Sequence, residues 1–162
     1  MTIRPATVDD VEQVIPLVGK VAAFHQQRDP SRYSYISNVA ERYRNWLTQR
    51  ATDEQSVFLV AEREAVGGQD ARLVGFLVAA TERDISIYTI NPIGFVHDLW
   101  VDEEYRNEGV GRQMVMLAVE RFREIGVRQI RLDVLIDNQP ARTLFEACGF
   151  RPSTILMLQD VE

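Results

Sequence analysis

Helical periodicity is clearest in the stretch that follows Gly109. Apolar residues recur there every three or four positions, at Val110, Met114, Leu117, Ala118, Phe122 and Ile125. This spacing places them on one face of a helix. Gly126 comes directly after the last of them, and a glycine at that point commonly ends a helix because it accepts left-handed backbone angles. The pattern predicts an amphipathic helix from about residue 110 to residue 125.

Two further helices are predicted before residue 51. The first runs from about residue 8 to residue 26. Thr7 and Asp10 have the spacing of a capping box at its start, and Pro16 should kink it. An irregular polar stretch follows, in which Asp29-Pro30-Ser31 is typical of a turn. The second helix covers about residues 39–50, and its inward-facing residues are Tyr43, Trp46 and Leu47.

Period-two alternation and short apolar runs predict the strands. The expected strands are residues 2–5, 57–62, 73–80, 95–101, 127–136 and 150–158. The second and third should form a hairpin, because Gly67-Gly68 marks a turn in the loop from Ala65 to Ala71. Between the last two strands, Asn138 and Pro140 open a short helix that ends at Gly149.

Strands and helices interleave along the chain without an internal repeat or a linker-like segment. A length of 162 residues suits one domain with a sizeable core. We therefore predict an α/β (α+β) fold, a single domain over residues 1–162 with a mixed sheet and helices on both of its faces.

Composition narrows the classes of function. The net charge of −6 argues against a nucleic-acid partner and mildly favours a cationic substrate. No apolar run approaches the length of about 20 residues that a membrane span needs, and the N-terminus lacks a signal-peptide core, so we expect a cytoplasmic protein without a membrane partner. Cys148 is the one cysteine, which excludes intrachain disulfides and cysteine-built metal sites, and we expect no metal.

Two glycines stand between the strand that ends at Val101 and the helix that begins near Val110. Gly109 and Gly111 leave the backbone open to close approach, and the first turn of a helix has N–H groups without partners. Such a loop suits a ligand with several anionic oxygens. A plain flexible turn is the alternative. A dinucleotide fingerprint fits poorly, because Met114 stands where its third glycine is needed.

Three motifs resemble the GNAT N-acetyltransferase superfamily. Arg106-x-x-Gly109-x-Gly111 is similar to its acyl-CoA signature. Asn138-x-x-Ala141-x-x-Leu144-Phe145-x-x-x-Gly149-Phe150 resembles its second signature, and Ile3-Arg4-Pro5-Ala6-Thr7 resembles its opening. The resemblance spans nearly the whole chain and is strongest over residues 95–150.

The resemblance implies a mostly antiparallel sheet whose fourth and fifth strands splay apart, with the pantetheine arm of acetyl-CoA in the gap. It implies that acetyl-CoA is the donor co-substrate, held by the backbone amides of residues 106–112. The implied donor-binding residues are Leu99, Trp100, Val101, Arg106, Asn107, Glu108, Gly109, Val110, Gly111, Arg112, Asn138 and Phe145. As alternatives, Arg106 and Arg112 are solvated surface residues, and Asn138 caps a helix.

The resemblance also points to the catalytic groups. A protonated amine cannot attack a thioester, so a base must remove its proton. His97 is our first candidate, because an imidazole titrates near neutral pH. Asp98 is the second candidate and could anchor the ammonium cation of the substrate instead. Adjacent residues of a strand point to opposite faces of the sheet, but a bulge would disturb this alternation. Backbone N–H groups near Leu99 or Trp100 would stabilise the oxyanion, and a structural role for His97 remains the alternative.

The sequence departs from the family at the leaving group. Many members have a tyrosine at the position of Phe145, where the hydroxyl protonates the thiolate; Phe145 should instead pack in the core or beside the pantetheine. A thiol has a pKa of about 8.5, so its thiolate leaves fairly well without an acid. Water, Tyr105 or Tyr88 could substitute. We expect Cys148 to pack rather than to carry an acyl group.

The resemblance implies that two loops, residues 25–38 and 84–94, contribute to the acceptor site. Tyr33, Tyr35 and Tyr88 could surround an ammonium group by cation–π contacts. The expected activity is acetyl transfer from acetyl-CoA directly to a primary amine of a small molecule, in a possible homodimer. Two alternatives remain: transfer to a protein N-terminus or lysine, and a module that binds acyl-CoA without catalysis.

Overall fold

The computed structural model describes residues 1–67 and 70–161, and within these residues the chain is built on one five-stranded sheet. The strands stand in chain order: β1 (Thr2–Pro5), β2 (Ser56–Arg63), β3 (Arg72–Glu82), β4 (Ile93–Val101) and β5 (Ile130–Leu132). The pairings from β1 to β4 are antiparallel, and β5 runs parallel to β4. A mixed and mostly antiparallel sheet is confirmed.

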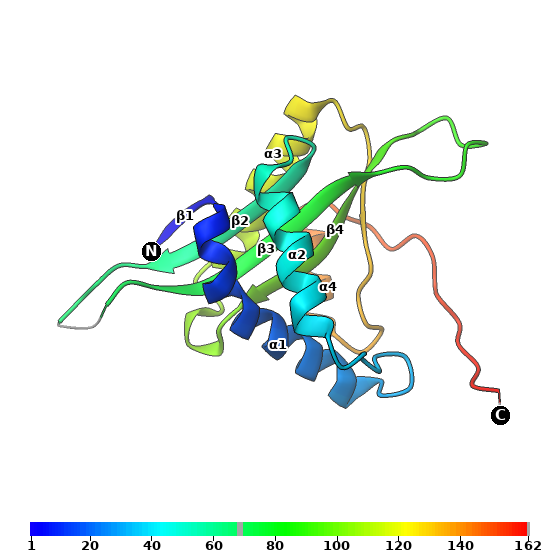
Figure 1. The fold of residues 1–162 in the computed structure, drawn as a ribbon. Coiled ribbons are helices and arrows are strands. Elements are labelled where there is room, and N and C mark those ends of the chain that lie inside the picture. The colour runs from blue at the N-terminus through cyan, green and yellow to red at the C-terminus, as the bar shows by residue number, and fades with distance from the viewer. Residues whose placement is uncertain (68–69, 162) are drawn as a thin grey trace.

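Helices cover both faces of this sheet, as predicted. Helices α1 (Val11–Arg28) and α2 (Val39–Thr52) cross one face, and α3 (Val110–Ile125) and α4 (Gln139–Ala147) lie on the other (Figure 1). Short 3-10 turns η1 (Val8–Asp10) and η2 (Glu103–Tyr105) precede α1 and α3. No helix in the described residues is long and apolar enough to cross a membrane.

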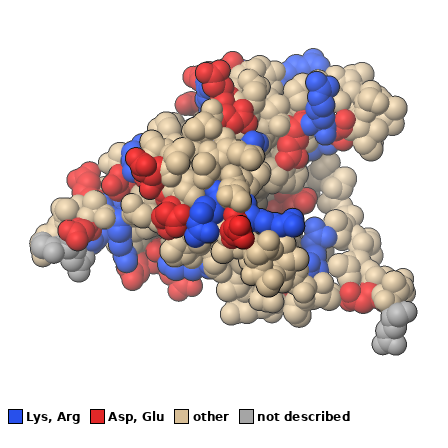
Figure 2. All heavy atoms as spheres, in the orientation of Figure 1, with Lys and Arg blue, Asp and Glu red and all other residues tan. Residues whose placement is uncertain are grey.

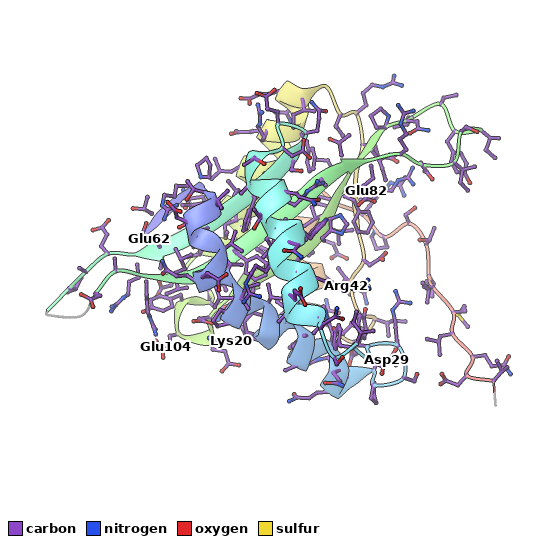
Figure 3. The ribbon with its side chains drawn as sticks, in the orientation of Figure 1. Lys20, Asp29, Arg42, Glu62, Glu82 and Glu104 are labelled. Carbon is purple, nitrogen blue, oxygen red and sulfur yellow. The ribbon has the colours of Figure 1, made fainter. Side chains whose placement is uncertain are left out.

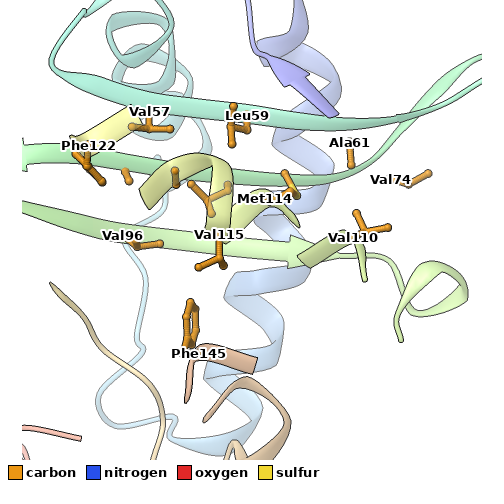
Figure 4. Packing of buried hydrophobic residues seen from close by; sticks show 13 residues of the cluster. Val57, Leu59, Ala61, Val74, Val96, Val110, Met114, Val115, Phe122 and Phe145 are labelled. Atoms are coloured by element: carbon orange, nitrogen blue, oxygen red, sulfur yellow. The ribbon is translucent and has the colours of Figure 1, made fainter. Parts of the chain in front are cut away.

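The sheet separates two hydrophobic clusters, because side chains alternate along each strand. On β3, Phe76 and Val78 face α1 and α2, whereas Leu77 and Ala79 face α3. The cluster under α3 is shown in Figure 4, where Met114, Val115 and Phe122 meet the side chains of the strands. A Cβ at Gly94 would lie 3.0 Å from the Phe122 ring, so the absence of a side chain lets the helix approach β4.

A buried carboxylate fixes the start of the first helical segment. Asp10 accepts hydrogen bonds from the Thr7 backbone N–H at 2.7 Å and the Thr7 hydroxyl at 3.0 Å, which confirms the capping relation. Arg4 donates to both oxygens of Asp10 and to Glu62 on β2. The Arg4 guanidinium lowers the pKa of Asp10 to about 2. This network joins β1, β2 and the capping turn.

Most predicted elements are confirmed to within a few residues, and two predictions are wrong. The strand expected over residues 127–136 is limited to Ile130–Leu132, and the strand expected over residues 150–158 does not form. That last segment runs away from the body after α4, with Ile155 and Met157 73% and 87% exposed (Figure 1). An apolar run forms a strand only where a neighbouring backbone supplies hydrogen bonds, and no described residue pairs with this segment. Gly68 of the expected hairpin turn lies outside the described residues.

Candidate active site

A β-bulge at His97 organises the candidate site. Along the β3–β4 pair Val78 stands opposite Asp98, but the next residue, Ala79, stands opposite Val96. His97 is therefore the additional residue of β4, and the usual alternation of side chains is interrupted there. As a result His97 and Asp98, although adjacent in sequence, both line the same cavity.

The cavity lies between α1, α2 and β4, on the face of the sheet opposite α3. Its volume is about 420 Å³. Its polar side chains come from several segments and are His25, Arg32, Tyr33, Tyr35, Tyr43, His97, Asp98 and Asp133. The remaining lining is largely aliphatic, as is common in sites for small molecules.

Asp98 is the most deeply buried charged group of the cavity, with 9% of its surface exposed. The Tyr43 hydroxyl donates to Asp98 Oδ2 at 2.8 Å. Burial raises the pKa of the Asp98 carboxyl, and the hydrogen bond from Tyr43 and the nearby His97 and His25 oppose this rise. Burial and the charge of Asp98 raise the pKa of Tyr43, so this phenol stays protonated and keeps donating. A cation beside Asp98 would offset the cost of burying the carboxylate.

His97 has a carboxylate partner on the neighbouring strand. Glu82 Oε1 at the end of β3 lies 2.6 Å from His97 Nε2, and Figure 3 shows Glu82 where β3 leaves the body of the sheet. In the neutral imidazole a carboxylate at Nε2 keeps the proton on that nitrogen, which leaves Nδ1 with its lone pair. The rings of Trp46 and Phe95 lie 4.9 and 5.1 Å from the imidazole centre and hold it in place.

The predicted tyrosines are only partly brought together. Tyr33 and Tyr35 line the cavity, and Tyr33 stacks on His25 with ring centres 4.7 Å apart. Burial lowers the pKa of His25 and raises that of Tyr35. Tyr88 lies elsewhere, in a separate hollow beside the β3–β4 loop, so the expected cage of three tyrosines does not form. Tyr43, from α2, takes its place in the cavity wall.

The glycine loop has the backbone geometry expected of an anion site. Gly109 caps α3 with a φ of 82°, and Asn107 has a φ of 64°, which are left-handed values. The first-turn amides of Val110, Gly111 and Arg112 have no carbonyl partner within the helix. A Cβ at Gly111 would lie 3.3 Å from Leu144 Cδ2, which shows how closely α3 approaches α4 here.

The splay of the fourth and fifth strands is also present. β5 pairs with Gly94, Phe95 and Val96, whereas β4 continues to Val101. From His97 onward, β4 therefore has no strand partner on that side within the described residues. The side chains of Leu99 and Val101 pack toward α3, and Trp100 packs against Phe24 of α1. Within the described chain, this edge of β4 therefore has no strand partner for its backbone groups, of which the Val101 carbonyl accepts from Arg106 Nε.

The other residues predicted to bind acetyl-CoA differ in exposure and in their contacts. Arg106 donates from Nε to the Val101 carbonyl at 2.8 Å, and its guanidinium lies 4.7 Å from the Trp100 ring centre, so it is held against β4. Arg112 and Glu108 are exposed. Asn138 caps α4 by accepting from the Ala141 N–H at 3.3 Å. Phe145 is buried against Phe150, which confirms its packing role.

Glu82 and His25 were not predicted from the sequence, and Tyr43 and Trp46 were predicted only to face inward from their helix. That inward spacing was a usable signal for Tyr43, which lines the cavity, and for Trp46, whose ring contacts His97. Nothing in the sequence pairs Glu82 with His97, since their contact depends on the register of two strands. Among the described residues no group of three or more His, Cys, Asp or Glu could hold a metal ion.

Comparisons to known proteins agree with the fold described above. The family model described as "Acetyltransferase (GNAT) family" matches residues 21–150. The chain therefore belongs to the GNAT acetyltransferase family.

Individual relatives are more distant. An uncharacterized N-acetyltransferase of Methanocaldococcus jannaschii is 29% identical over 96% of this chain, and the match spans 62% of that relative's length. A crystallised tetramutant protein of Bacillus halodurans superposes with a TM-score of 0.80 at 23% identity, covering 99% of this chain and all of that one. AAC(6')-Iy, solved with the bisubstrate analogue CoA-S-monomethyl-acetylneamine, superposes with a TM-score of 0.69 at 16% identity over 99% of this chain and 97% of that one. These superpositions confirm the fold.

Proposed function

We propose that the protein transfers an acetyl group from acetyl-CoA directly to a primary amine of a small molecule. The observation that carries the proposal is the bulge at His97. It brings a histidine and a buried carboxylate into one cavity, next to the point where β4 loses its strand partner. A thioester lying along that edge would meet an amine held in the cavity.

The donor would be held mainly by backbone groups. The free amides at the start of α3 and the left-handed turns at Asn107 and Gly109 suit the diphosphate of coenzyme A. The unpaired edge of β4 from His97 to Val101 suits the amides of the pantetheine arm. Arg106 would stiffen this edge through its contacts with Val101 and Trp100 rather than depend on a direct phosphate contact.

The acceptor would be held and deprotonated by neighbouring residues. Asp98 would attract the ammonium group, and His97 Nδ1 would take one of its protons while Glu82 stabilises the imidazolium that results. The amine nitrogen then forms its bond to the acetyl carbon, and a β4 amide near Leu99 or Trp100 stabilises the oxyanion. As the carbon–sulfur bond breaks, the nitrogen loses its second proton to water, which leaves an N-substituted acetamide. Phe145 supplies no proton, so the departing thiolate takes its proton from the same water.

The shape of the cavity favours a small acceptor. A protein N-terminus or lysine would need an open groove that admits a chain, whereas this cavity is walled by two helices and a strand. A module that only binds acyl-CoA would not need the His97–Glu82 contact or a buried carboxylate beside it. A single assay of acetyl-CoA with different amines distinguishes both alternatives from transfer to a small amine.

The test is release of free thiol from acetyl-CoA in the presence of a panel of primary amines, with a lysine peptide as comparison. We expect amine-dependent thiol release for small amines, and an acetylated amine of the matching mass. Binding of acetyl-CoA without transfer to any amine would support the binding module instead, and preference for the peptide would support a protein acceptor.

We also propose that the protein acts as a homodimer joined through its C-terminal segment, defined here as residues 151–161. The segment carries exposed Ile155, Leu156, Met157, Leu158 and Val161 and leaves the body after α4 (Figures 1 and 2). The outer edge of β5 has no strand partner in the described residues. The C-terminal segment of a second copy could pair with this edge of β5, because both have backbone N–H and C=O groups without a strand partner among the described residues.

A further inference from the structure

The charged groups of the cavity are unevenly distributed. Asp98 is buried, whereas Arg32 and Asp133, the other lining residues with a full charge, are exposed at the mouth. Arg32 and Asp133 are opposite in sign and exposed to solvent, which screens their charges. Asp98, with the Tyr43 hydroxyl as its hydrogen-bond partner, is therefore the buried carboxylate of the described lining.

Beside its polar residues, the cavity has an apolar part that offers no partner to a polar group of the substrate. Aliphatic and aromatic side chains line it from α1, α2, β4 and the segment after β5, namely Ile15, Val18, Ala22, Val39, Phe95 and Leu135. A hydroxyl or second ammonium placed against this apolar part would lose its hydration without gaining a partner there, which costs a few kcal/mol. An apolar group placed there would instead be stabilised by the removal of its surface from water.

From this we infer that the acceptor is a monoamine with an apolar body: one ammonium group at Asp98 and a hydrocarbon or aromatic portion along the wall. The inference rests on the proposed acetyl transfer and specifies its substrate class. It disfavours polyamines and aminosugars, which carry several charges or hydroxyls. The faces of Tyr35 and Tyr43 beside Asp98 would add cation–π attraction for the single ammonium.

The first test compares matched amines with acetyl-CoA in excess. Hexylamine and 1,6-diaminohexane differ by one ammonium. Cyclohexylmethylamine and 6-amino-6-deoxyglucose both carry the amine on a methylene beside a six-membered ring and differ in the hydroxyls and the ring oxygen. We expect kcat/KM to be at least roughly tenfold higher for the apolar member of each pair, the range that follows from leaving polar groups unpaired in a pocket. Equal or reversed preference would overturn the inference while leaving acetyl transfer intact. No transfer to any of the four, with donor binding retained, would instead contradict the proposed function.

The second test moves a charge into the wall. Ala22→Asp places a second carboxylate on the cavity side of α1, and Ala23→Asp places the same group on the neighbouring exposed position, which does not line the cavity. Both changes carry the same charge and the same helix propensity, so the second is a matched control.

In Ala22→Asp the ratio of kcat/KM for 1,6-diaminohexane over hexylamine should rise roughly tenfold or more, because the second ammonium gains a partner. Ala23→Asp should leave the ratio within about twofold of wild type. An unchanged ratio in Ala22→Asp, with both variants folded by circular dichroism, would show that the apolar wall does not select the substrate.

Discussion

At the scale of single residues, the site depends on one irregularity in β4. Without the bulge, His97 and Asp98 would point to opposite faces of the sheet, and only one could reach the cavity. With it, an imidazole in contact with Glu82 stands next to a carboxylate that accepts a hydrogen bond from Tyr43. Each group has a supporting partner from a neighbouring element, which is the arrangement expected of side chains that must keep a fixed geometry.

Replacing His97 tests its role as the base. His97→Gln should lower kcat by roughly tenfold or more near neutral pH, because the amine loses its proton acceptor. The dissociation constant of acetyl-CoA should stay within about twofold, since the imidazole lies on the cavity side of β4. Steady-state kinetics and calorimetry measure the two quantities, and unchanged kinetics would remove His97 from the mechanism.

Glu82→Gln provides the comparison for a positioning residue. The amide keeps the size of the side chain but cannot stabilise an imidazolium, so we expect a smaller loss of kcat than in His97→Gln, together with a shifted pH–rate profile. A variant that matched wild type at every pH would show that the contact of 2.6 Å between Glu82 and His97 serves only packing.

At the scale of elements, the helices and central strands could be predicted from periodicity, but the cavity could not. The stripe from Val110 to Ile125 and the glycines at each end of α3 defined that helix in the sequence, since caps and spacing are local properties. The splay of β4 and β5, the contact between His97 and Glu82, and the separation of Tyr88 from Tyr33 depend on strand register and loop direction. These are set by contacts between distant segments, which one sequence does not display.

The capping network of Asp10 makes an element-scale prediction about stability. Asp10→Asn should lower the free energy of unfolding at pH 7 by about 1–3 kcal/mol, because Arg4 and the Thr7 amide lose a buried charged partner. The pKa of Asp10 is lowered to about 2 in the folded state by Arg4, from an ordinary value near 3.8. The stabilisation is therefore present above pH 4 and is lost as the pH falls toward 2.

Urea titrations of wild type and Asp10→Asn across this range measure the effect. The difference in unfolding free energy should be constant from pH 7 to pH 5 and should shrink below pH 4. A difference that persisted unchanged at pH 2 would mean that the ionised carboxylate is not what stabilises the turn.

At the scale of the whole molecule, the C-terminal segment is an exposed part of the described chain whose backbone has no strand partner. It carries a short apolar run from Ile155 to Leu158 and exposes five large apolar side chains, yet pairs with no described residue. Exposed apolar patches of this kind commonly mark protein–protein contacts. The prediction of a strand over residues 150–158 would then be wrong for the monomer because the partner backbone belongs to another copy.

Charges placed in the segment test the dimer. Ile155→Asp/Met157→Asp changes two exposed apolar residues of one strand face, and Ser153→Asp/Gln159→Asp changes two exposed polar residues of the same parity as a control. Light scattering after size exclusion should find a dimer for wild type and the control pair but a monomer for the first pair. A monomeric wild type, or a first pair that stays dimeric, would contradict the proposed contact.

The central claim is that the amides at the start of α3 hold the diphosphate of acetyl-CoA, and two substitutions at Gly111 test it most directly. Gly111→Ala and Gly111→Glu meet the same contact of 3.3 Å with Leu144, but only the second adds an anion beside those amides. Calorimetric titration with acetyl-CoA should find binding within a few-fold of wild type for Gly111→Ala and weakened by about 100-fold or more for Gly111→Glu, since opposed like charges cost several kcal/mol. Wild-type affinity in folded Gly111→Glu would place the donor elsewhere and contradict the account.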